Sequence, residues 1–275
     1  MRIFFILILA LSLSACTGVF FQPQQIQYMT PDKIGLQYEE VKFRSSDGLM
    51  LSGWFLPAQG KAKGTVLFFH GNAENISTHI ANVYWLPAQH YNVFLPDYRG
   101  YGGSEGSPSL AGVQDDINSA MAYLLKRADI DTQRIVILGQ SLGGASAIYN
   151  VAHSPYRANI KALITESAFS DYRSIAREKL SSFWLTWPLQ WPLSYTIDND
   201  YSPLPVAGKI SPIPLLIIHG DKDRVVPLAH GQALYAAAAQ PKEMWMVEGG
   251  GHIDAFRRKD YQIKLLEYLQ DTLKN

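Results

Sequence analysis

Short apolar segments alternate with longer amphipathic stretches along most of this chain, and that alternation limits the folds open to it. Parallel strands buried on both faces read as short apolar runs, and helices connect them. The expected strands cover residues 65–69, 92–95, 134–138, 162–165, 215–218 and 244–247. Between the second and third of these, a three- and four-residue period predicts a helix with Asp115, Asp116 and Lys126 outside an apolar face formed by Leu110, Val113, Ile117, Ala120, Met121, Leu124 and Leu125. We therefore expect an α/β fold whose mostly parallel sheet has about eight strands and is flanked by helices.

The domain organisation follows from the regions that break this rhythm. Residues 39–43 and 49–55 alternate in polarity around the turn-forming residues 46–48, which predicts an antiparallel hairpin at one edge of the sheet. Residues 167–210 are expected to form a small helical cap inserted into a single domain of residues 38–275. The aromatic side chains of the cap either line a substrate site or pack its helices onto the domain body. They are Phe183, Trp184, Trp187, Trp191 and Tyr195.

The N-terminal segment predicts export. Residues 1–15 join a short positive start to an apolar run that is shorter than the ~20 residues of a membrane-spanning helix. Residues 13–16, Leu-Ser-Ala-Cys, are similar to a bacterial lipobox, in which cleavage leaves the cysteine as a lipidated N-terminus. We expect a signal peptide over residues 1–15, a lipidated Cys16 with a tether over residues 16–37, and order from Tyr38 onward. The mature protein is then a membrane-anchored lipoprotein of the bacterial cell envelope; an ordinary signal peptide with a cysteine, or a retained anchor, is the alternative.

Charge and cysteine content exclude several classes of partner. Lys+Arg and Asp+Glu are both 24, so electrostatics gives no reason to expect nucleic-acid binding. Cys16 is the only cysteine, so the fold must depend on its core rather than on a disulfide. His70, Glu74 and His79 lack the HExxH spacing of a zinc site. Neither a metal nor a cofactor is expected, and the oligomeric state is not predicted.

A GxSxG motif, Gly-Gln-Ser-Leu-Gly at residues 139–143, directly follows one of the expected strands and precedes an expected helix. This is the context of a nucleophile elbow, in which a strained strand-to-helix turn exposes the serine hydroxyl above the sheet. Side chains at residues 139 or 143 would collide with neighbouring backbone, which explains the two glycines. Ser141 is therefore the candidate nucleophile.

A serine nucleophile needs a base, and His252 is the candidate. It follows three glycines after the last expected strand, in a loop that can reach across the strand ends, whereas the other six histidines lie in less suitable elements. A carboxylate must orient this base. The loop after residue 219 offers Asp221 and Asp223; we prefer Asp223, although spacing alone does not separate the two.

The sequence His70-Gly71-Asn72 closes the expected strand over residues 65–69, at a position where a loop can supply an oxyanion donor. The backbone N–H groups of Asn72 and Leu142 are the expected pair. Such donors polarise a carbonyl without a metal.

Taken together, these motifs resemble α/β hydrolases of the abhydrolase type, a group that includes lysophospholipases, depalmitoylases and proteins described as serine-aminopeptidase-like. The resemblance runs from about residue 38 to residue 273 and rests on residues 70–75, 97–106, 139–144, 219–223 and 251–252. It implies the α/β-hydrolase fold and places the acid at Asp223. The expected activity is hydrolysis of a carboxylic ester or thioester of a small, lipid-like acyl substrate. A serine aminopeptidase, or a surface binding lipoprotein without turnover, is the alternative.

Overall fold

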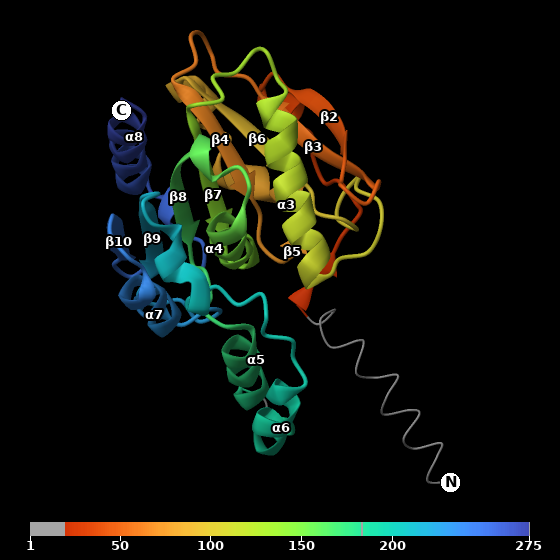
Figure 1. The fold of residues 1–275 in the computed structure, drawn as a ribbon, viewed down its shortest axis with the longest axis vertical. Coiled ribbons are helices and arrows are strands. Elements are labelled where there is room, and N and C mark those ends of the chain that lie inside the picture. Colours follow the sequence, from red (N-terminus) through yellow and green to blue (C-terminus); the bar gives the residue numbers. More distant parts are fainter. Residues whose placement is uncertain (1–19, 183, 275) are drawn as a thin grey trace.

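The computed structural model describes residues 20–182 and 184–274 (Figure 1). Its main sheet has eight strands in the order β10-β9-β8-β7-β4-β6-β3-β2, and only the β2–β3 and β3–β6 pairs are antiparallel. The strands are β2 (Glu39–Arg44), β3 (Met50–Leu56), β4 (Gly64–Phe69), β6 (Tyr91–Pro96), β7 (Ile135–Gln140), β8 (Ile160–Glu166), β9 (Leu215–Gly220) and β10 (Lys242–Val247). The predicted mostly parallel sheet and the edge hairpin are confirmed.

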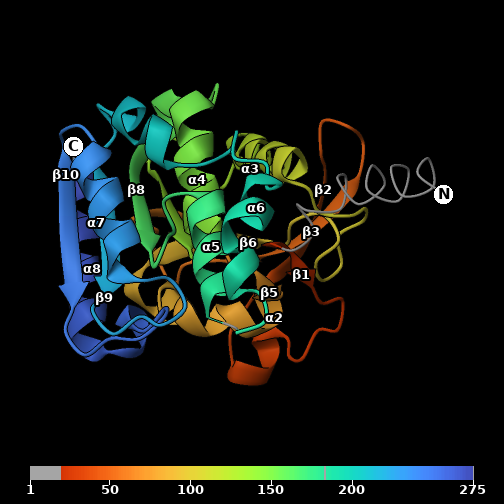
Figure 2. The ribbon, with the colours of Figure 1, turned by 90° about the horizontal axis from the view of Figure 1, so that it is seen from below.

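Helices cover both faces of the sheet (Figure 2). Side chains alternate along each strand, so neighbouring residues enter different cores. In β4, Leu67 and Phe69 pack with α3 (Leu110–Leu125) and α4 (Leu142–His153), while Val66 and Phe68 pack with α2 (Ile76–His79) and α8 (Lys259–Lys274). Further helices are α7 (Leu228–Ala237) and the 3-10 helices η2 (Pro31–Ile34), η3 (Ile80–Asn82), η4 (Pro87–Gln89), η5 (Arg157–Asn159) and η8 (Ala255–Arg257).

The inserted cap follows β8 and stands out from the sheet (Figure 1). It contains α5 (Tyr172–Ser181), η6 (Trp187–Leu189) and α6 (Gln190–Tyr195). The expected cap was longer, because η7 (Leu204–Ile210) belongs to the domain body. Val206, Ala207 and Ile210 of η7 are buried in the same core as α4.

The prediction that order begins near Tyr38 is wrong. Strand β1 (Gln22–Pro23) pairs in parallel with β5 (Ala73–Glu74), and Phe21 is buried. The Asn75 side chain also donates to two backbone carbonyls of this segment, at residues 24 and 26. The polar side chains of this segment face solvent, while its backbone and the side chain of Phe21 are held against the rest of the protein. Polarity alone therefore gave the wrong prediction of a tether. Cys16 and the expected signal peptide lie outside the described residues.

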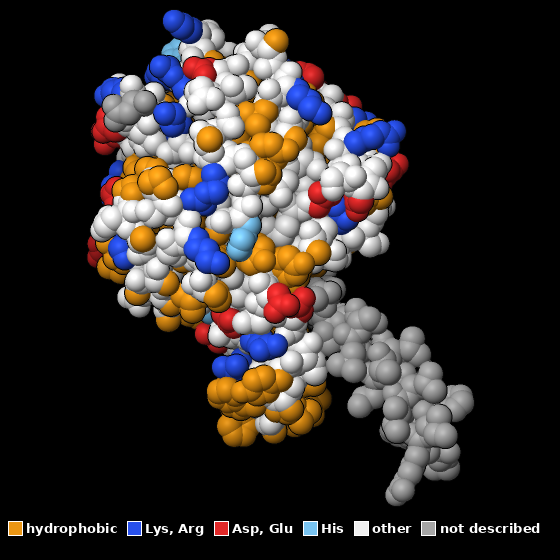
Figure 3. All heavy atoms as spheres, viewed as in Figure 1, with side chains coloured by type: hydrophobic (Ala, Val, Ile, Leu, Met, Phe, Trp, Pro, Cys, Tyr) orange, Lys and Arg blue, Asp and Glu red, His pale blue; other side chains and the backbone are white. Residues whose placement is uncertain are grey.

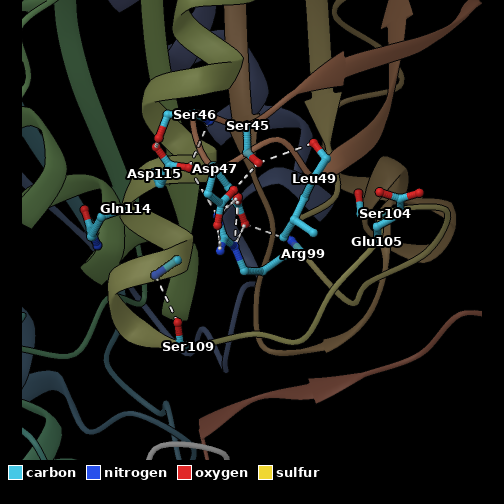
Figure 4. Close-up of polar contacts among 12 residues, drawn as sticks. Ser45, Ser46, Asp47, Leu49, Arg99, Ser104, Glu105, Ser109, Gln114 and Asp115 are labelled. Atoms are coloured by element: carbon cyan, nitrogen blue, oxygen red, sulfur yellow. Dashed lines mark hydrogen bonds and ion pairs between the residues drawn. The ribbon is translucent and has the colours of Figure 1, made fainter.

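A buried guanidinium joins the hairpin turn to α3 (Figure 4). Arg99 donates to Asp116 Oδ1 at 2.8 Å and to Asp47 Oδ2 at 2.8 Å, and it lies 3.2 Å from Asp115 Oδ2. Asp116 was expected outside the apolar face, but it is only 2% exposed. Because Arg99 neutralises it and supplies its hydrogen bonds, this carboxylate can lie against the sheet. Ser109 caps the same helix by accepting from Gly112 N–H at 3.0 Å.

Candidate active site

Ser141 occupies the sharp turn between β7 and α4. Its backbone has φ 51° and ψ −116°, a left-handed conformation that a non-glycine residue rarely adopts. A Cβ at Gly139 would lie 2.6 Å from Gly143 O, and one at Gly143 would lie 2.3 Å from Phe69 O. The two glycines therefore let the turn close against β4, as the motif predicts.

Asp223 and His252 lie together at the carboxyl ends of the neighbouring strands. His252 Nδ1 lies 2.8 Å from Asp223 Oδ2, in the geometry of an N–H donating to a carboxylate. Asp223 Oδ1 accepts from the N–H groups of Val225 and Val226, both at 2.8 Å. Burial raises the pKa of Asp223, but the hydrogen bonds from His252 and these amides outweigh burial and hold the pKa below its usual value. Between the two candidate carboxylates, the one that contacts His252 is Asp223 rather than Asp221.

The elbow and the loop that carries His252 both contact the carboxyl end of β8. Ser141 N–H donates to the backbone carbonyl of Glu166, and Ile253 N–H donates to the hydroxyl of the next residue, Ser167, at 3.2 Å. A Cβ at Gly71 would lie 3.6 Å from Ser141 Cβ and 3.7 Å from Ile253 Cδ1. Within residues 20–182 and 184–274, Ser141 Oγ and His252 Nε2 are not joined by a hydrogen bond. Such bonds between catalytic groups often tighten only when substrate is bound.

Ser141 opens into a mostly apolar cavity of about 540 Å³ between the strand ends and the cap. Asn72 and Leu142 line it beside Ser141, and Lys179 is the only charged side chain among its described lining residues. The remaining walls are largely apolar and include Phe20, Phe169, Ile175, Leu180, Leu193, Ile197 and Val226. The arrangement can therefore hold an uncharged, extended apolar group with one end next to the serine hydroxyl.

The two expected oxyanion donors lie at this same end of the cavity. Leu142 is the first residue of α4, so its N–H has no intrahelical partner and lies at the positive end of the helix dipole. The Asn72 side chain is fixed, because its Oδ1 accepts from Gln22 N–H at 2.8 Å and from the Tyr101 hydroxyl at 3.2 Å. The N-terminal segment thus helps to hold the loop that carries Asn72.

Sequence reasoning missed Glu166, which links the elbow to the histidine loop. Its carboxylate is buried and accepts from Gln140 Nε2 at 2.6 Å and from Ala255 N–H at 2.7 Å. Burial raises the pKa of Glu166 to about 7, and the two hydrogen bonds oppose that rise. The available signal was an acidic residue at the end of an apolar strand.

His70, which precedes the oxyanion loop, faces Asp97 in a sealed site. His70 Nε2 lies 3.5 Å from Asp97 Oδ1, and both side chains are 0% exposed. His70 Nδ1 donates to Gly71 O at 2.8 Å. Burial lowers the pKa of His70 to about 3 and raises that of Asp97 to about 7. The described residues contain no cluster of three metal-ligating side chains, here or elsewhere.

Phe183 lies outside the described residues, and the described aromatic side chains of the cap follow neither of the two expectations. The side chains of Trp184, Trp187 and Trp191 are 77%, 59% and 53% exposed, and none of them lines the cavity. The cap lines the cavity instead with residues 175, 176, 179, 180, 193, 196 and 197.

Within the described part of the chain, no helix combines the length and the apolar character that a membrane-spanning helix needs.

Known proteins with similar sequences and structures agree with this architecture. YfhR of Escherichia coli strain K12 is 39% identical over 242 residues, which cover 86% of this chain and 81% of YfhR. The alpha/beta hydrolase domain-containing protein WAV2 of Arabidopsis thaliana is 35% identical over 240 residues, 83% of this chain and 76% of WAV2. The Pyrococcus furiosus esterase Pf2001 superposes with a TM-score of 0.74 over 93% of this chain and 97% of the esterase, at 19% identity, which supports the fold alone.

The family described as "Serine aminopeptidase, S33" matches residues 60–199, a range that includes the elbow, the oxyanion loop and much of the cap. The sheet order and the sharp turn at Ser141 agree with this match. The chain belongs to this S33 family of hydrolases and has the α/β-hydrolase fold.

Proposed function

We propose that this protein is a serine hydrolase that cleaves a carboxylic ester or thioester of an apolar acyl group. The observation that carries the proposal is the position of Ser141, at the end of an apolar cavity and beside the loop that holds the His252–Asp223 pair. A hydroxyl, a base and a carboxylate in that order form the charge arrangement that acyl transfer to serine requires.

In the proposed reaction, Ser141 Oγ attacks the acyl carbon while His252 Nε2 takes the hydroxyl proton. Asp223 accepts from Nδ1–H, which fixes the tautomer that leaves Nε2 free and stabilises the imidazolium. The N–H groups of Asn72 and Leu142 hold the negative oxygen. His252 then protonates the departing alcohol or thiol, which leaves an acyl-serine. Water attacks the acyl carbon of this ester while the same histidine takes a proton from that water. The bond between the acyl carbon and Ser141 Oγ then breaks, the histidine returns the proton to Oγ, and the carboxylic acid leaves.

The cavity lining favours an ester or thioester over a peptide with a free N-terminus. An aminopeptidase needs a carboxylate to bind the substrate ammonium group, and the described lining holds none. In the cap, Glu178 instead contacts His230 Nε2 at 3.1 Å, and neither Asp198 nor Asp200 lines the cavity. A peptidase remains the second candidate because the same groups cleave amides.

A panel of substrates tests this choice. p-Nitrophenyl esters of graded chain length are compared with aminoacyl p-nitroanilides at equal concentration. We expect ester turnover to exceed amide turnover and to favour acyl chains over acetate. Faster turnover of the aminoacyl anilides would overturn the ester proposal in favour of the peptidase.

A fluorophosphonate probe separates a hydrolase from a binding protein. We expect the wild type to be labelled and Ser141→Ala to be unlabelled. This variant keeps the Cβ at the left-handed turn and so leaves the strain at residue 141 unchanged. An unlabelled wild type that still retains acyl ligands would favour the binding lipoprotein.

We further propose that the protein is exported and anchored to a membrane of the bacterial cell envelope by a lipid on Cys16. The support is the short apolar run and the lipobox-like residues 13–16. Growth with an alkyne fatty acid should label the wild type and leave Cys16→Ala unlabelled. Equal labelling of both would exclude Cys16 as the lipidated residue.

A further inference from the structure

The cap presents an apolar surface that the proposed reaction does not use. We define the cap tip as residues 184–195, at the lower end of the molecule in Figure 3. Among the described residues, seven of the fourteen exposed large apolar side chains lie in this range. They are Trp184, Leu185, Trp187, Leu189, Trp191, Leu193 and Tyr195. Exposed apolar side chains gathered in one patch mark an interaction surface, whereas scattered ones do not.

The composition of the cap tip fits the interface of a lipid bilayer. Residues 184–196 contain no charged side chain, and they combine leucines with tryptophans and a tyrosine. Tryptophan and tyrosine concentrate at the headgroup level of membranes, where an apolar ring and a polar edge are both satisfied. The tip is too short to span a bilayer, so it would lie in the interface.

One cation is held against the apolar surface of the tip. Helix α5 carries Arg173, Arg177, Glu178 and Lys179, while Asp171, Asp198 and Asp200 flank the helix and the tip in the sequence. The Arg177 guanidinium lies 3.9 Å from the centre of the Trp191 ring, so a positive charge is held next to the apolar surface. Cations at this level attract the anionic headgroups of phospholipids.

The cap tip also adjoins the cavity that holds Ser141. Leu193 belongs to both, because it is 40% exposed and lines the cavity together with Lys179 and Leu180. Phe20 lines the same cavity and packs its ring against Tyr172 of α5, with the ring centres 5.1 Å apart. Residue 16 lies four positions before Phe20, so an extended chain separates their Cα atoms by no more than about 14 Å.

We propose that the cap tip docks into the interfacial region of a phospholipid membrane, so that an acyl chain leaving the bilayer reaches the cavity through the cap. The proposed lipid on Cys16 would enter the same membrane beside the cap, which leaves one orientation for the domain. The docking surface itself rests on the cap residues and needs neither lipidation nor turnover.

Vesicle co-sedimentation of the full chain tests the proposal. A Cys16→Ala background removes the lipid, and the vesicles contain phosphatidylcholine and phosphatidylglycerol at three to one. The test variant is Trp187→Ser with Leu189→Ser, neither of which lines the cavity. The matched control is Met246→Ser with Ile263→Ser, whose side chains are 57% and 49% exposed on β10 and α8. We expect the test variant to bind at least about tenfold more weakly than the background and the control to bind as the background does.

Three results would overturn the proposal. The first is equal vesicle binding by the test and control variants, which excludes the cap tip as the docking surface. The second is binding that ignores the tip and depends only on phosphatidylglycerol. The third is a dimer in the absence of vesicles that the test variant abolishes, which assigns the tip to a second copy of the chain. Turnover of a short soluble ester, measured on the same samples, reports separately on the proposed triad and should be unchanged in both variants.

Discussion

Two histidine–aspartate pairs lie at the same edge of the sheet, and they differ in access and in protonation. In the pair His252–Asp223, Nδ1 lies 2.8 Å from the carboxylate and the histidine side chain is 19% exposed. In the pair His70–Asp97, the nearest atoms are 3.5 Å apart and both side chains are sealed from solvent. In the first pair, His252 Nε2 has no hydrogen-bond partner among the described residues. In the second pair, His70 packs against Tyr98, with ring centres 4.5 Å apart.

The difference shows how hydrogen bonds decide the charge of a buried carboxylate. At Asp223, hydrogen bonds outweigh burial and hold the pKa below its usual value, so the carboxylate stays charged and can stabilise an imidazolium. At Asp97, burial outweighs one hydrogen bond from Ile76 N–H and raises the pKa to about 7. His70, with its pKa lowered to about 3, stays neutral and holds the loop that leads to Asn72.

Removing each imidazole should separate the two roles most strongly. We expect His252→Ala to lower ester turnover by about four to six orders of magnitude with little loss of stability. His70→Ala should instead lower the free energy of unfolding by about 2–4 kcal/mol, because it leaves a buried cavity beside Asp97. Urea unfolding and turnover, measured on both variants, check this. An active His252→Ala enzyme would contradict the difference in role between the two histidines.

The carboxylates give the next largest contrast. Asp223→Asn should lower turnover by about 10⁴-fold, because the amide favours the wrong tautomer of His252. Asp221→Asn, two residues away and without contact to His252, is the matched control and should keep nearly wild-type turnover. Comparable losses in both variants would mean that the loop, rather than the carboxylate at residue 223, sets the activity.

The sealed pair predicts how stability changes with pH. The pKa of Asp97 is raised from 3.8 to about 7, so between these values the folded state binds more protons than the unfolded state. Stability contributed by this group is therefore present at low pH and lost as pH rises to about 7. His70, whose pKa is lowered from 6.5 to about 3, contributes with the opposite sign, so the Asp97 contribution is read as the stability of the wild type minus that of Asp97→Asn. Unfolding at fixed salt should show this difference falling by an amount on the order of 1–3 kcal/mol as pH rises to about 7.

Asp97→Asn should lack the Asp97 contribution, because the amide keeps an acceptor for Ile76 N–H and has no proton to release. Asp271→Asn on exposed α8 is the control and should reproduce the wild-type curve. A stability difference between the wild type and Asp97→Asn that rises across this pH range would contradict the protonation assigned to Asp97.

Replacing Glu166 by glutamine should have the smallest effect and sharpens the comparison from the side of the elbow. The Oε1 atom of Gln140 is buried without a partner, so in Glu166→Gln the Gln140 side chain can rotate and accept from the new amide. We expect this variant to equal or exceed wild-type stability by up to about 1 kcal/mol above pH 7, where the Glu166 carboxyl, with its pKa raised to about 7, is charged.

Glu166→Ala lacks both acceptors and should lose about 2–3 kcal/mol. Denaturation at pH 8 compares the variants. A glutamine variant as unstable as the alanine variant would mean that the charged carboxylate itself is needed to join Gln140 to Ala255.

The sequence alone could predict what local pattern determines. Buried parallel strands must be apolar, and a strand followed by Gly139, Ser141 and Gly143 predicts the elbow, whose steric reason the structure confirms. His252 was placed by its loop, and the loop does bring it to a carboxylate. Spacing could not choose between Asp221 and Asp223, because that choice depends on where two neighbouring amides point; the family resemblance made it.

Features that depend on contacts between residues distant in the sequence could not be predicted from it. Phe21 lies in a polar segment, yet its side chain enters the core that α3 and α4 share. Asp116 has the pattern of a solvent-facing residue, but Arg99, from another loop, satisfies it. Glu166 binds across 89 residues to Ala255 N–H. The cap tryptophans are residues typical of a core, yet they lie on the surface. Their exposure could not be predicted, because local sequence does not indicate which elements will cover them.

A crystal structure of the fluorophosphonate adduct tests the central claim most directly, since it records the nucleophile, the base and the oxyanion donors in one state. We expect phosphorus bonded to Ser141 Oγ, the phosphoryl oxygen about 3 Å from the N–H groups of Asn72 and Leu142, and His252 Nε2 turned toward the phosphonate while Nδ1 stays on Asp223. Phosphorus on another side chain, or an adduct at Ser141 with His252 out of reach, would contradict it.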